Sequence, residues 1–314
     1  MNTKNIANIP DYLSYPKRFL PYKWYKPLLT ILIAVAFWFL IGGAIMILNP
    51  VTLEAFRTGG AGSYDTLDAY SPLGALGSFG NVAAFLPALL IANRIVNARP
   101  FSSYSSSRGG FNWAAFFKSL ASAVVLFVIP VTVFTVLTEP NTGVIKFTVL
   151  GFIVCTILCP LQCAGEEYVC RGLLMQTFGS WFKFPVIAII LQAVCFAAIH
   201  PYNLIGVVSV FTIGIILGVC AYVTKGLESS CALHIANNMT TFYLAGFGIG
   251  GVKTEVSLLE LIVPAILGLL FLGFIILATK KFSWFSKVKK DDVALFNAKI
   301  EAKKAKKSRC LKKC

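Results

Sequence analysis

Two adjacent acidic residues, Glu166 and Glu167, stand at the end of a long hydrophobic stretch, in the run GEEYVCR at 165–171. On a helix, Glu167 and Arg171 would lie four residues apart on one face, in the favourable order for an ion pair. Glu166 would point about 100° away from that face and lack this partner. A carboxylate without a cationic partner is free to take up a proton, as a general base must. The alternative is that both acids only cap or pair at a helix end.

Both histidines of the chain also fall in hydrophobic segments. Phe196 and His200 have the helical i, i+4 spacing, so the phenyl ring can pack against the imidazole and help to fix it. His234 and Asn238 have the same spacing and can both donate hydrogen bonds to one point, as an oxyanion hole requires. Hydrogen bonding between packed helices would use the same residue types. Each pair taken alone leaves both interpretations open.

The composition places these groups in a membrane. The 314 residues are 57% hydrophobic and 13% charged, whereas a soluble domain carries about 25% charged residues. A helix needs roughly 20 apolar residues to cross the bilayer core, and this chain has enough for several such helices. Ionisable side chains inside a bilayer are costly and are functional candidates by default. We therefore predict an all-α, polytopic membrane helical bundle with its chemistry in the glutamates and histidines.

Hydropathy predicts about eight membrane-spanning helices. They are expected near Leu28–Leu48, Leu73–Val96, Ser119–Leu137, from Lys146 past Gly165, Pro185–His200, Leu204–Thr224, Ser229–Phe247 and Leu258–Thr279. With the N-terminus placed inside, 25 of the 28 Lys and Arg residues fall in inside segments, and only Arg57, Lys146 and Lys253 fall outside. This asymmetry follows the positive-inside rule, so we predict that both termini are cytoplasmic.

The predicted spans divide the chain into three parts. Residues 1–27 form a cytoplasmic N-terminal segment, residues 28–280 a membrane-embedded domain with its motif core at 146–247, and residues 281–314 a basic cytoplasmic tail. Because so long a segment precedes the first span, we expect that span to be permanent and not part of a cleaved signal peptide. The Ser/Gly-rich loop 102–110 (SSYSSSRGG) is expected to be mobile.

The tail explains most of the net charge of +15, because 13 basic residues lie from Lys280 onward. A disordered tail of this kind suits anionic lipid headgroups, although a plain topology anchor would have the same composition. The charge therefore does not indicate a nucleic-acid partner.

Helix geometry brings two of the motifs to similar depth. Glu166 lies 16 residues before Phe182, near the turn between two spans, and His200 lies 18 residues after it. At 1.5 Å per residue these positions are roughly 24 and 27 Å from the turn, so they would meet in an antiparallel hairpin. His234 lies only nine residues beyond Lys225 and fits less well, unless the helices tilt or the hairpin extends beyond the membrane.

The three motifs, in this order and each on its own hydrophobic segment, resemble the CPBP family of intramembrane proteases. This family contains the type II CAAX prenyl endopeptidases and the bacterial Abi and bacteriocin-processing proteins. The matching residues are the motifs E-E-x-x-x-R at 166–171, F-x-x-x-H at 196–200 and H-x-x-x-N at 234–238. The resemblance covers Lys146–Phe247, and the flanking segments match only in being hydrophobic.

The resemblance implies an eight-helix intramembrane endopeptidase acting on a membrane-associated protein or peptide, of the CAAX type or resembling a bacteriocin or leader. Glu166 with His200 would activate a water molecule for attack on the scissile carbonyl. His234 and Asn238 would stabilise the resulting oxyanion. We further expect a bacterial cell membrane as the location and the lipid bilayer as a partner.

The remaining motif residues, Glu167, Arg171 and Phe196, would support the site structurally. No metal or other cofactor is expected, because the compact zinc motif H-E-x-x-H is absent from the sequence. The alternative is a metalloprotease with Zn²⁺ held by Glu166, His200 and His234, since zinc accepts such ligands and keeps a position open for water.

Two non-proteolytic functions fit the same residues. One is bacteriocin self-immunity or another binding role without cleavage. The other is a proton-coupled transporter, in which intramembrane glutamate and histidine form a proton relay. The chain lacks the matched, interrupted segments in two halves that such transporters often show, and this favours the protease.

Overall fold

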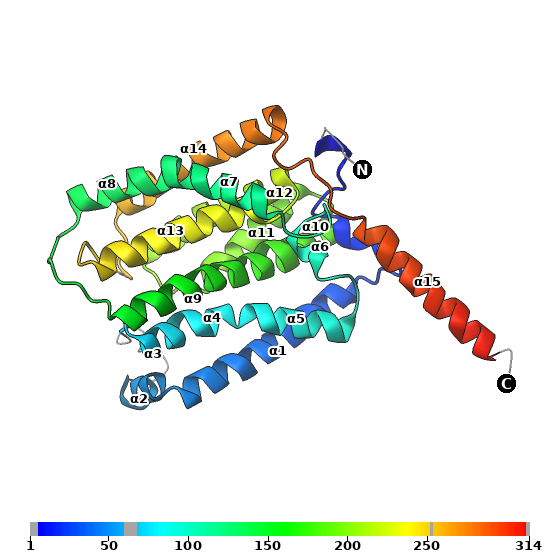
Figure 1. Ribbon diagram of the computed structural model, residues 1–314, viewed down its shortest axis with the longest axis horizontal. Coiled ribbons are helices and arrows are strands. Elements are labelled where there is room, and N and C mark those ends of the chain that lie inside the picture. Colours follow the sequence, from blue (N-terminus) through cyan, green and yellow to red (C-terminus); the bar gives the residue numbers. More distant parts are fainter. Residues whose placement is uncertain (1–5, 60–67, 252–253, 312–314) are drawn as a thin grey trace.

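The computed structural model describes residues 6–59, 68–251 and 254–311, and over these residues the chain is helical, with isolated β-bridges and no strand (Figure 1). Lys253, placed outside the membrane by the sequence, lies beyond the described residues, as do Lys4 and the last three residues of the tail. The structure confirms the predicted all-α bundle.

Several helices join end to end into longer rods. The elements are, in chain order, η1 (Ile6–Asn8), η2 (Tyr15–Arg18), α1 (Tyr25–Leu48), α2 (Pro50–Gly59), α3 (Pro72–Ala75), η4 (Leu76–Gly80), α4 (Asn81–Ala83), α5 (Phe85–Val96), α6 (Ser102–Ser105), α7 (Trp113–Ala123), η5 (Val124–Val128), α8 (Ile129–Thr138), α9 (Val149–Glu167), η6 (Tyr168–Met175), α10 (Gln176–Phe182), α11 (Pro185–Ala198), α12 (Leu204–Thr224), α13 (Glu228–Gly246), α14 (Leu258–Lys281) and α15 (Asp292–Leu311). Of these, η4, η5 and η6 are π-helical.

Within the described residues, six helices are long and apolar enough to cross a membrane. They are α1, the rods α3–α5, α7–α8 and α9–α10, α12 and α14. The other two predicted spans are helices as well, but α11 has only 14 residues and α13 is more polar, because it carries part of the motif core. The chain is thus a multi-pass membrane protein, and six of the eight predicted spans meet the criteria of length and hydropathy.

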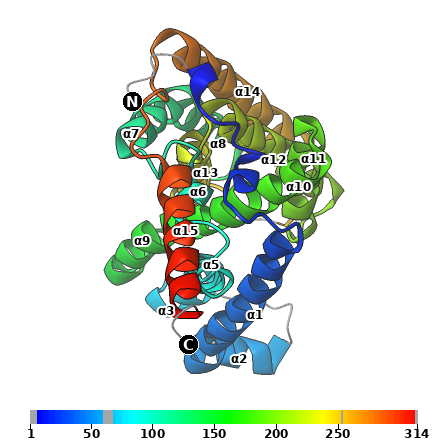
Figure 2. The same cartoon turned by 90° about the vertical axis from the view of Figure 1, so that its right-hand side faces the viewer.

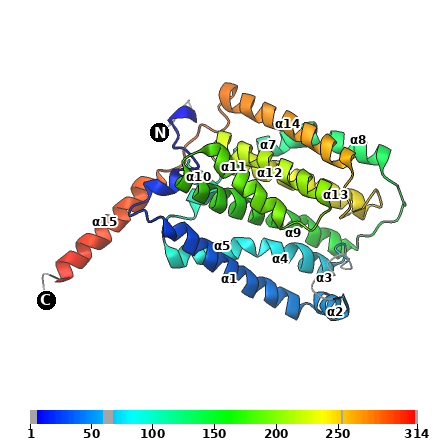
Figure 3. The same cartoon turned by 180° about the vertical axis from the view of Figure 1, so that it is seen from behind.

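Helix α13 forms the centre of the bundle. It packs against α7, α9 and α12, and Figures 1 and 3 both show it enclosed by neighbouring helices. The view down the bundle in Figure 2 shows α1 on one side and α14 on the other. Both termini lie at the same end of the bundle (Figure 1). The motif helices α9, α11 and α13 are therefore held from several sides.

The start of α9 is fixed by close packing on the segment before α3. Thr148 accepts a hydrogen bond from the Gly151 amide, and Cys155 Sγ lies 3.1 Å from the carbonyl oxygen of Ala69. A Cβ atom at Gly151 would lie 1.8 Å from the carbonyl oxygen of Tyr70, closer than real Cβ atoms come. Only glycine lets the two backbones approach this closely.

We expect Gly151→Ala to lower the free energy of unfolding by about 1–3 kcal/mol, since the added methyl group must push α9 away from Tyr70. The measurement is thermal or denaturant unfolding of the purified protein in detergent. Gly273→Ala in α14 is the matched control, because a Cβ atom there meets nothing within 4 Å. Equal stability of the two variants would contradict the packing argument.

The loop 102–110 is not the mobile segment that its Ser/Gly content suggested. Residues 103–109 are buried, and Ser103 and Ser107 donate hydrogen bonds to the carbonyl oxygens of Pro100 and Pro10, at 2.6 and 2.7 Å. The prediction was wrong because the serine hydroxyls pair with backbone carbonyls of neighbouring segments, which composition does not reveal.

Within this loop, Arg108 forms a buried ion pair with Glu228, the first residue of α13. The same carboxylate accepts a hydrogen bond from the Asn112 amide, at 2.7 Å through its other oxygen. The loop therefore anchors the N-terminal end of the central helix, six residues before His234.

The tail is also more structured than the predicted disordered segment. It contains α15, which projects from the end of the bundle (Figures 1 and 3). Its first turns dock on the N-terminal segment: Asn297 donates to the carbonyl oxygen of Arg18 at 3.1 Å, and the rings of Phe296 and Phe19 lie 5.6 Å apart. The residues AKIEAKKAKK at 298–307 are nearly all strong helix formers, which explains the helix.

Candidate active site

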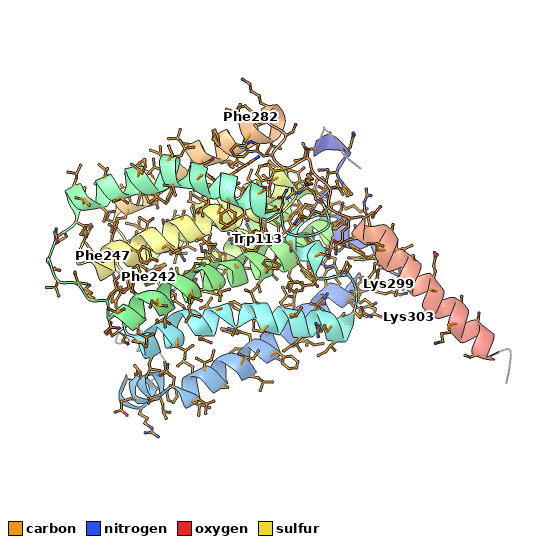
Figure 4. The ribbon with its side chains drawn as sticks, in the orientation of Figure 1. Trp113, Phe242, Phe247, Phe282, Lys299 and Lys303 are labelled. Carbon is orange, nitrogen blue, oxygen red and sulfur yellow. The ribbon has the colours of Figure 1, made fainter. Side chains whose placement is uncertain are left out.

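A cavity of about 620 Å³ lies inside the motif core and reaches α1 and the rod α3–α5. Most of its wall is apolar, as with Trp38 on α1, Phe85 on α5 and Phe242 on α13; Phe242 is labelled in Figure 4. Its nitrogen- and oxygen-bearing side chains are Ser78, Gln162, Glu166, His200, Tyr202, His234, Asn237, Asn238 and Trp38. The four residues predicted to be catalytic therefore share one cavity.

Helix α9 presents its two glutamates differently. Glu166 is 5% exposed, lines the cavity and accepts a hydrogen bond from Gln162 at 2.8 Å. Glu167 is fully buried behind the lining and pairs with Arg171, with 2.8 Å between Oε1 and Nη1. This is the ion pair that the sequence predicted. The helical offset between adjacent residues thus sends one carboxylate to the cavity and the other to a buried cation.

Arg171 lies in the π-helical segment η6 and is fully buried. Its guanidinium group makes three contacts. It pairs with Glu167, donates to the carbonyl oxygen of Gly214 at 3.3 Å, and its guanidinium carbon lies 4.4 Å from the centre of the Phe196 ring. A cation over an aromatic face is favourable, the more so when both are desolvated. Phe196 therefore contacts Arg171 and also both histidines, since its ring centre lies 4.8 Å from that of His200 and 5.8 Å from that of His234.

His234 lies between the two glutamates. Its Nδ1 is 2.9 Å from Oε1 of Glu167 and its Nε2 is 3.3 Å from Oε2 of Glu166. Ionised carboxylates only accept hydrogen bonds, so Nδ1 must donate to the Arg171-paired Glu167. Nε2 then either donates to Glu166 or accepts a proton from it. One proton can therefore be shared between Glu166 and Nε2 of His234, while Glu167 holds the other ring nitrogen.

His200 lies just past the end of α11, two residues later than Ala198. Its Nδ1 is 2.7 Å from the carbonyl oxygen of Phe196, and its ring lies 4.8 Å from the Phe196 ring and 5.8 Å from the Tyr202 ring. The predicted packing of Phe196 on His200 is present. A carbonyl oxygen accepts only, so Nδ1 carries the proton and Nε2 of the neutral ring is a free acceptor.

Asn238 completes the cavity on α13. Its Nδ2 is 3.4 Å from Oε1 of Gln162, and its Oδ1 accepts from Asn237 at 3.0 Å. Because Gln162 also donates to Glu166, this amide joins the proposed base to the proposed oxyanion donor. Sequence reasoning missed Gln162; the available signal was an amide four residues before Glu166 within an apolar helix.

A second missed residue is Gln192 in α11, which is fully buried. Its side-chain amide donates to the carbonyl oxygen of Gly214 at 2.9 Å, the same oxygen that accepts from Arg171. The sequence signal was again a single amide in an apolar helix. Gln192 thereby ties α11 to α12 beside the buried ion pair.

The alternative zinc site is not assembled in this geometry. Over the part of the chain that the structure describes, no group of three or more His, Cys, Asp or Glu side chains is placed to hold a metal ion. Glu166, His200 and His234 share a cavity, but they do not form such a set.

The segment that contains the three motifs is also the one that matches a known protein family. Residues 146–240 match the model of a family described as type II CAAX prenyl endopeptidase Rce1-like. This segment is similar to an Rce1-like domain. It contains all three motifs and the amide residues Gln162 and Gln192, and it confirms the resemblance inferred from the motifs. The family is one of CAAX-type intramembrane proteases, in accord with the apolar helices that carry the domain.

One curated relative is an uncharacterised protein, YyaK, from Bacillus subtilis (strain 168), which is 24% identical over 165 residues. The match covers 49% of this chain and 55% of the relative, so the chain spans about half the length of the curated relative it matches. No solved structure matches the chain at a significant level.

Proposed function

We propose that this protein is an intramembrane endopeptidase that hydrolyses a peptide bond of a membrane-associated protein or peptide, with Glu166 as the general base. One observation carries the proposal: Glu166 faces a largely apolar cavity together with His200, His234 and Asn238, inside the Rce1-like domain. A carboxylate, two imidazoles and an amide that converge on one space can supply both a base and hydrogen-bond donors.

In the first step, Glu166 removes a proton from a water molecule in the cavity while the water oxygen attacks the scissile carbonyl carbon. His200 assists as an acceptor through Nε2, because its Nδ1 is occupied by the Phe196 carbonyl. General-base catalysis of this kind contributes about 10²–10⁴-fold to the rate.

In the second step, negative charge develops on the former carbonyl oxygen. His234 and Asn238 lie one helical turn apart on α13 and donate to this oxygen through Nε2 and Nδ2. Because Nδ1–H of His234 already donates to Glu167, His234 acts here as the imidazolium, with both ring nitrogens protonated. Glu167 holds the Nδ1–H of His234 and so fixes the ring. The carbon–nitrogen bond then breaks, and the leaving amine takes up the proton from Glu166. Each such donor is worth about 10²–10³-fold in rate.

The apolar wall favours a substrate with an apolar group close to the cleaved bond. A prenylated C-terminus of the CAAX type has this chemistry, and so does a hydrophobic leader or bacteriocin peptide. The relative YyaK comes from a bacterium, which supports our proposal that the protein acts in a bacterial cell membrane.

The test uses purified protein and a peptide ending in Cys, two aliphatic residues and a final residue, with or without a prenyl group on the cysteine. We expect cleavage of the prenylated peptide after the cysteine, unchanged by a zinc chelator, because Glu166 and His200 activate water without a metal. Mass spectrometry of the products measures both. Loss of cleavage with the chelator and its return with zinc would instead assign the metalloprotease mechanism.

We also propose that α15 contacts anionic lipid headgroups. Lys299, Lys303 and Lys306 are exposed and lie on one helix face by their spacing, and Figure 4 shows Lys299 and Lys303 projecting clear of the bundle. Each lysine at an anionic surface is worth about 1 kcal/mol. The docked first turns keep this face near the end of the bundle.

We therefore expect amide hydrogen exchange in α15 to slow when phosphatidylglycerol replaces phosphatidylcholine in nanodiscs. Replacing the three lysines by glutamine should remove the difference, and so should high salt, which screens exposed charges. Identical exchange of the wild-type protein in both lipids would refute the contact and leave the tail as a topology anchor.

A further inference from the structure

A second cavity, of about 260 Å³, lies between α8, α12, α13 and α14. Polar side chains lie along its wall, namely Thr135, Glu139, Ser209, Thr212, Thr241 and Glu260. Hydroxyl and carboxylate oxygens on the wall of a cavity between membrane helices favour occupation by water, which can bond to their remaining lone pairs where lipid cannot.

The two cavities share one wall. Tyr202, Val210, Ile213 and Asn237 line both of them, so a single layer of side chains separates the polar cavity from the catalytic one. Asn237 donates to Oδ1 of Asn238 at 3.0 Å. The dividing layer is therefore bonded directly to a residue of the proposed oxyanion hole.

The polar cavity extends to where the helices end, at the end of the bundle opposite the termini (Figure 1). Glu139 is the C-cap of α8, and Glu260 lies in the first turn of α14, in a capping box with Ser257. Gly250, in the loop after α13, also lines the cavity. Helix ends with charged caps mark the boundary with water, because the lipid core cannot solvate them.

Hydrolysis consumes one water molecule for every bond cleaved. An apolar substrate group that fills the catalytic cavity displaces water from the α1 side, where the wall is formed by Ile31, Val35 and Trp38. The polar cavity approaches from the other side, and its wall contains none of these three residues. Water arriving there needs to pass only the Tyr202–Asn237 layer.

We propose that the second cavity is the route by which water reaches Glu166 from the end of the bundle opposite the termini. The proposal rests on the proposed hydrolase function for its purpose, but the presence of water in the cavity can be tested without any substrate. Ser209 is suited to the test, because it lines the second cavity and not the catalytic one.

The experiment uses Ser209→Cys in sealed proteoliposomes and a charged, membrane-impermeant methanethiosulfonate reagent, added to one face and then to the other. A thiol reacts as its thiolate, which forms only where water reaches it. We expect modification from one face, about tenfold or more faster than for Ser122→Cys, which places the same thiol on α7 outside both cavities. Wild-type protein corrects for the native cysteines.

We also expect the bulky adduct at position 209 to lower kcat for the cleaved peptide about tenfold while KM is unchanged, because it limits water and not substrate binding. Ser209→Phe should act in the same way without a reagent. A Ser209→Cys thiol that reacts no faster than that of Ser122→Cys would overturn the proposal, and so would full modification without loss of cleavage. If the wild type cleaves no peptide, the proposed hydrolysis fails separately, and the labelling alone decides whether water enters the cavity.

Discussion

Glu166→Gln is expected to reduce peptide cleavage by about 10³-fold or more while the protein remains folded. The amide keeps the volume of the carboxylate and can still pair with Gln162, but it cannot remove a proton from water. The fold should tolerate the loss of the Glu166 charge, because the buried cation Arg171 is neutralised by Glu167 and not by Glu166. The effect should therefore lie in kcat, with substrate binding largely retained.

The measurement is the initial rate of cleavage at saturating substrate, with unfolding in detergent as the check on folding. Glu301→Gln is the matched control, since Glu301 is an exposed acid on α15, remote from the cavity, and its removal should leave the rate unchanged. A Glu166→Gln protein that cleaves at a rate within a few fold of wild type would show that another group is the base.

Arg171→Met is expected to lower the free energy of unfolding by about 3–5 kcal/mol, because it leaves Glu167 as an unpaired charge in a fully buried position. The guanidinium also lies over Phe196 and donates to the Gly214 carbonyl, and methionine replaces neither contact. The packing of α9, α11 and α12 against one another should weaken, because Arg171 contacts all three helices.

The double variant Glu167→Gln/Arg171→Met separates this charge effect from simple loss of packing. With the unpaired charge removed, much of the stability should return, as for other buried ion pairs replaced as a unit. Denaturant unfolding followed by tryptophan fluorescence would compare the variants. If Arg171→Met alone were as stable as wild type, the buried pair would not organise the site.

Local spacing predicted the parts of the site that depend on one helix. The Glu167–Arg171 pair and the packing of Phe196 on His200 follow from i, i+4 geometry, and both are present. The hairpin depth calculation also placed Glu166 and His200 near each other, and the structure puts them in one cavity. These features could be predicted because helical geometry alone determines them.

Contacts between helices could not be predicted in this way. The depth calculation fitted His234 less well, yet the structure places this residue between the two glutamates. The rod from Val149 to Phe182 is 34 residues long, and this extension of the hairpin explains how a histidine close to its own turn reaches the depth of Glu166. Whether His234 and Glu166 lie at the same depth depends on how far α9 and α13 are shifted along the bundle axis relative to each other. Local sequence spacing does not determine this shift.

Composition misled at two places. The serines of loop 102–110 suggested mobility, but their hydroxyls pair with backbone carbonyls and Arg108 reaches Glu228 on α13. The lysines of the tail suggested disorder, but lysine and alanine favour helix when the charges are spaced. In both segments, composition alone suggested a solvated, unstructured chain. The structure shows instead that contacts with other segments, or helix propensity, order these residues.

The most direct test of the central claim is to map new peptide ends. Wild-type protein and Glu166→Gln are each incubated in proteoliposomes with solubilised membrane proteins from the source cells, and the peptide ends are compared by mass spectrometry. We expect a defined set of new ends with wild type that is absent with Glu166→Gln. If the two proteins gave the same ends while Glu166→Gln still supported the protein's role in the cell, hydrolysis by Glu166 would be contradicted and a binding function would replace it.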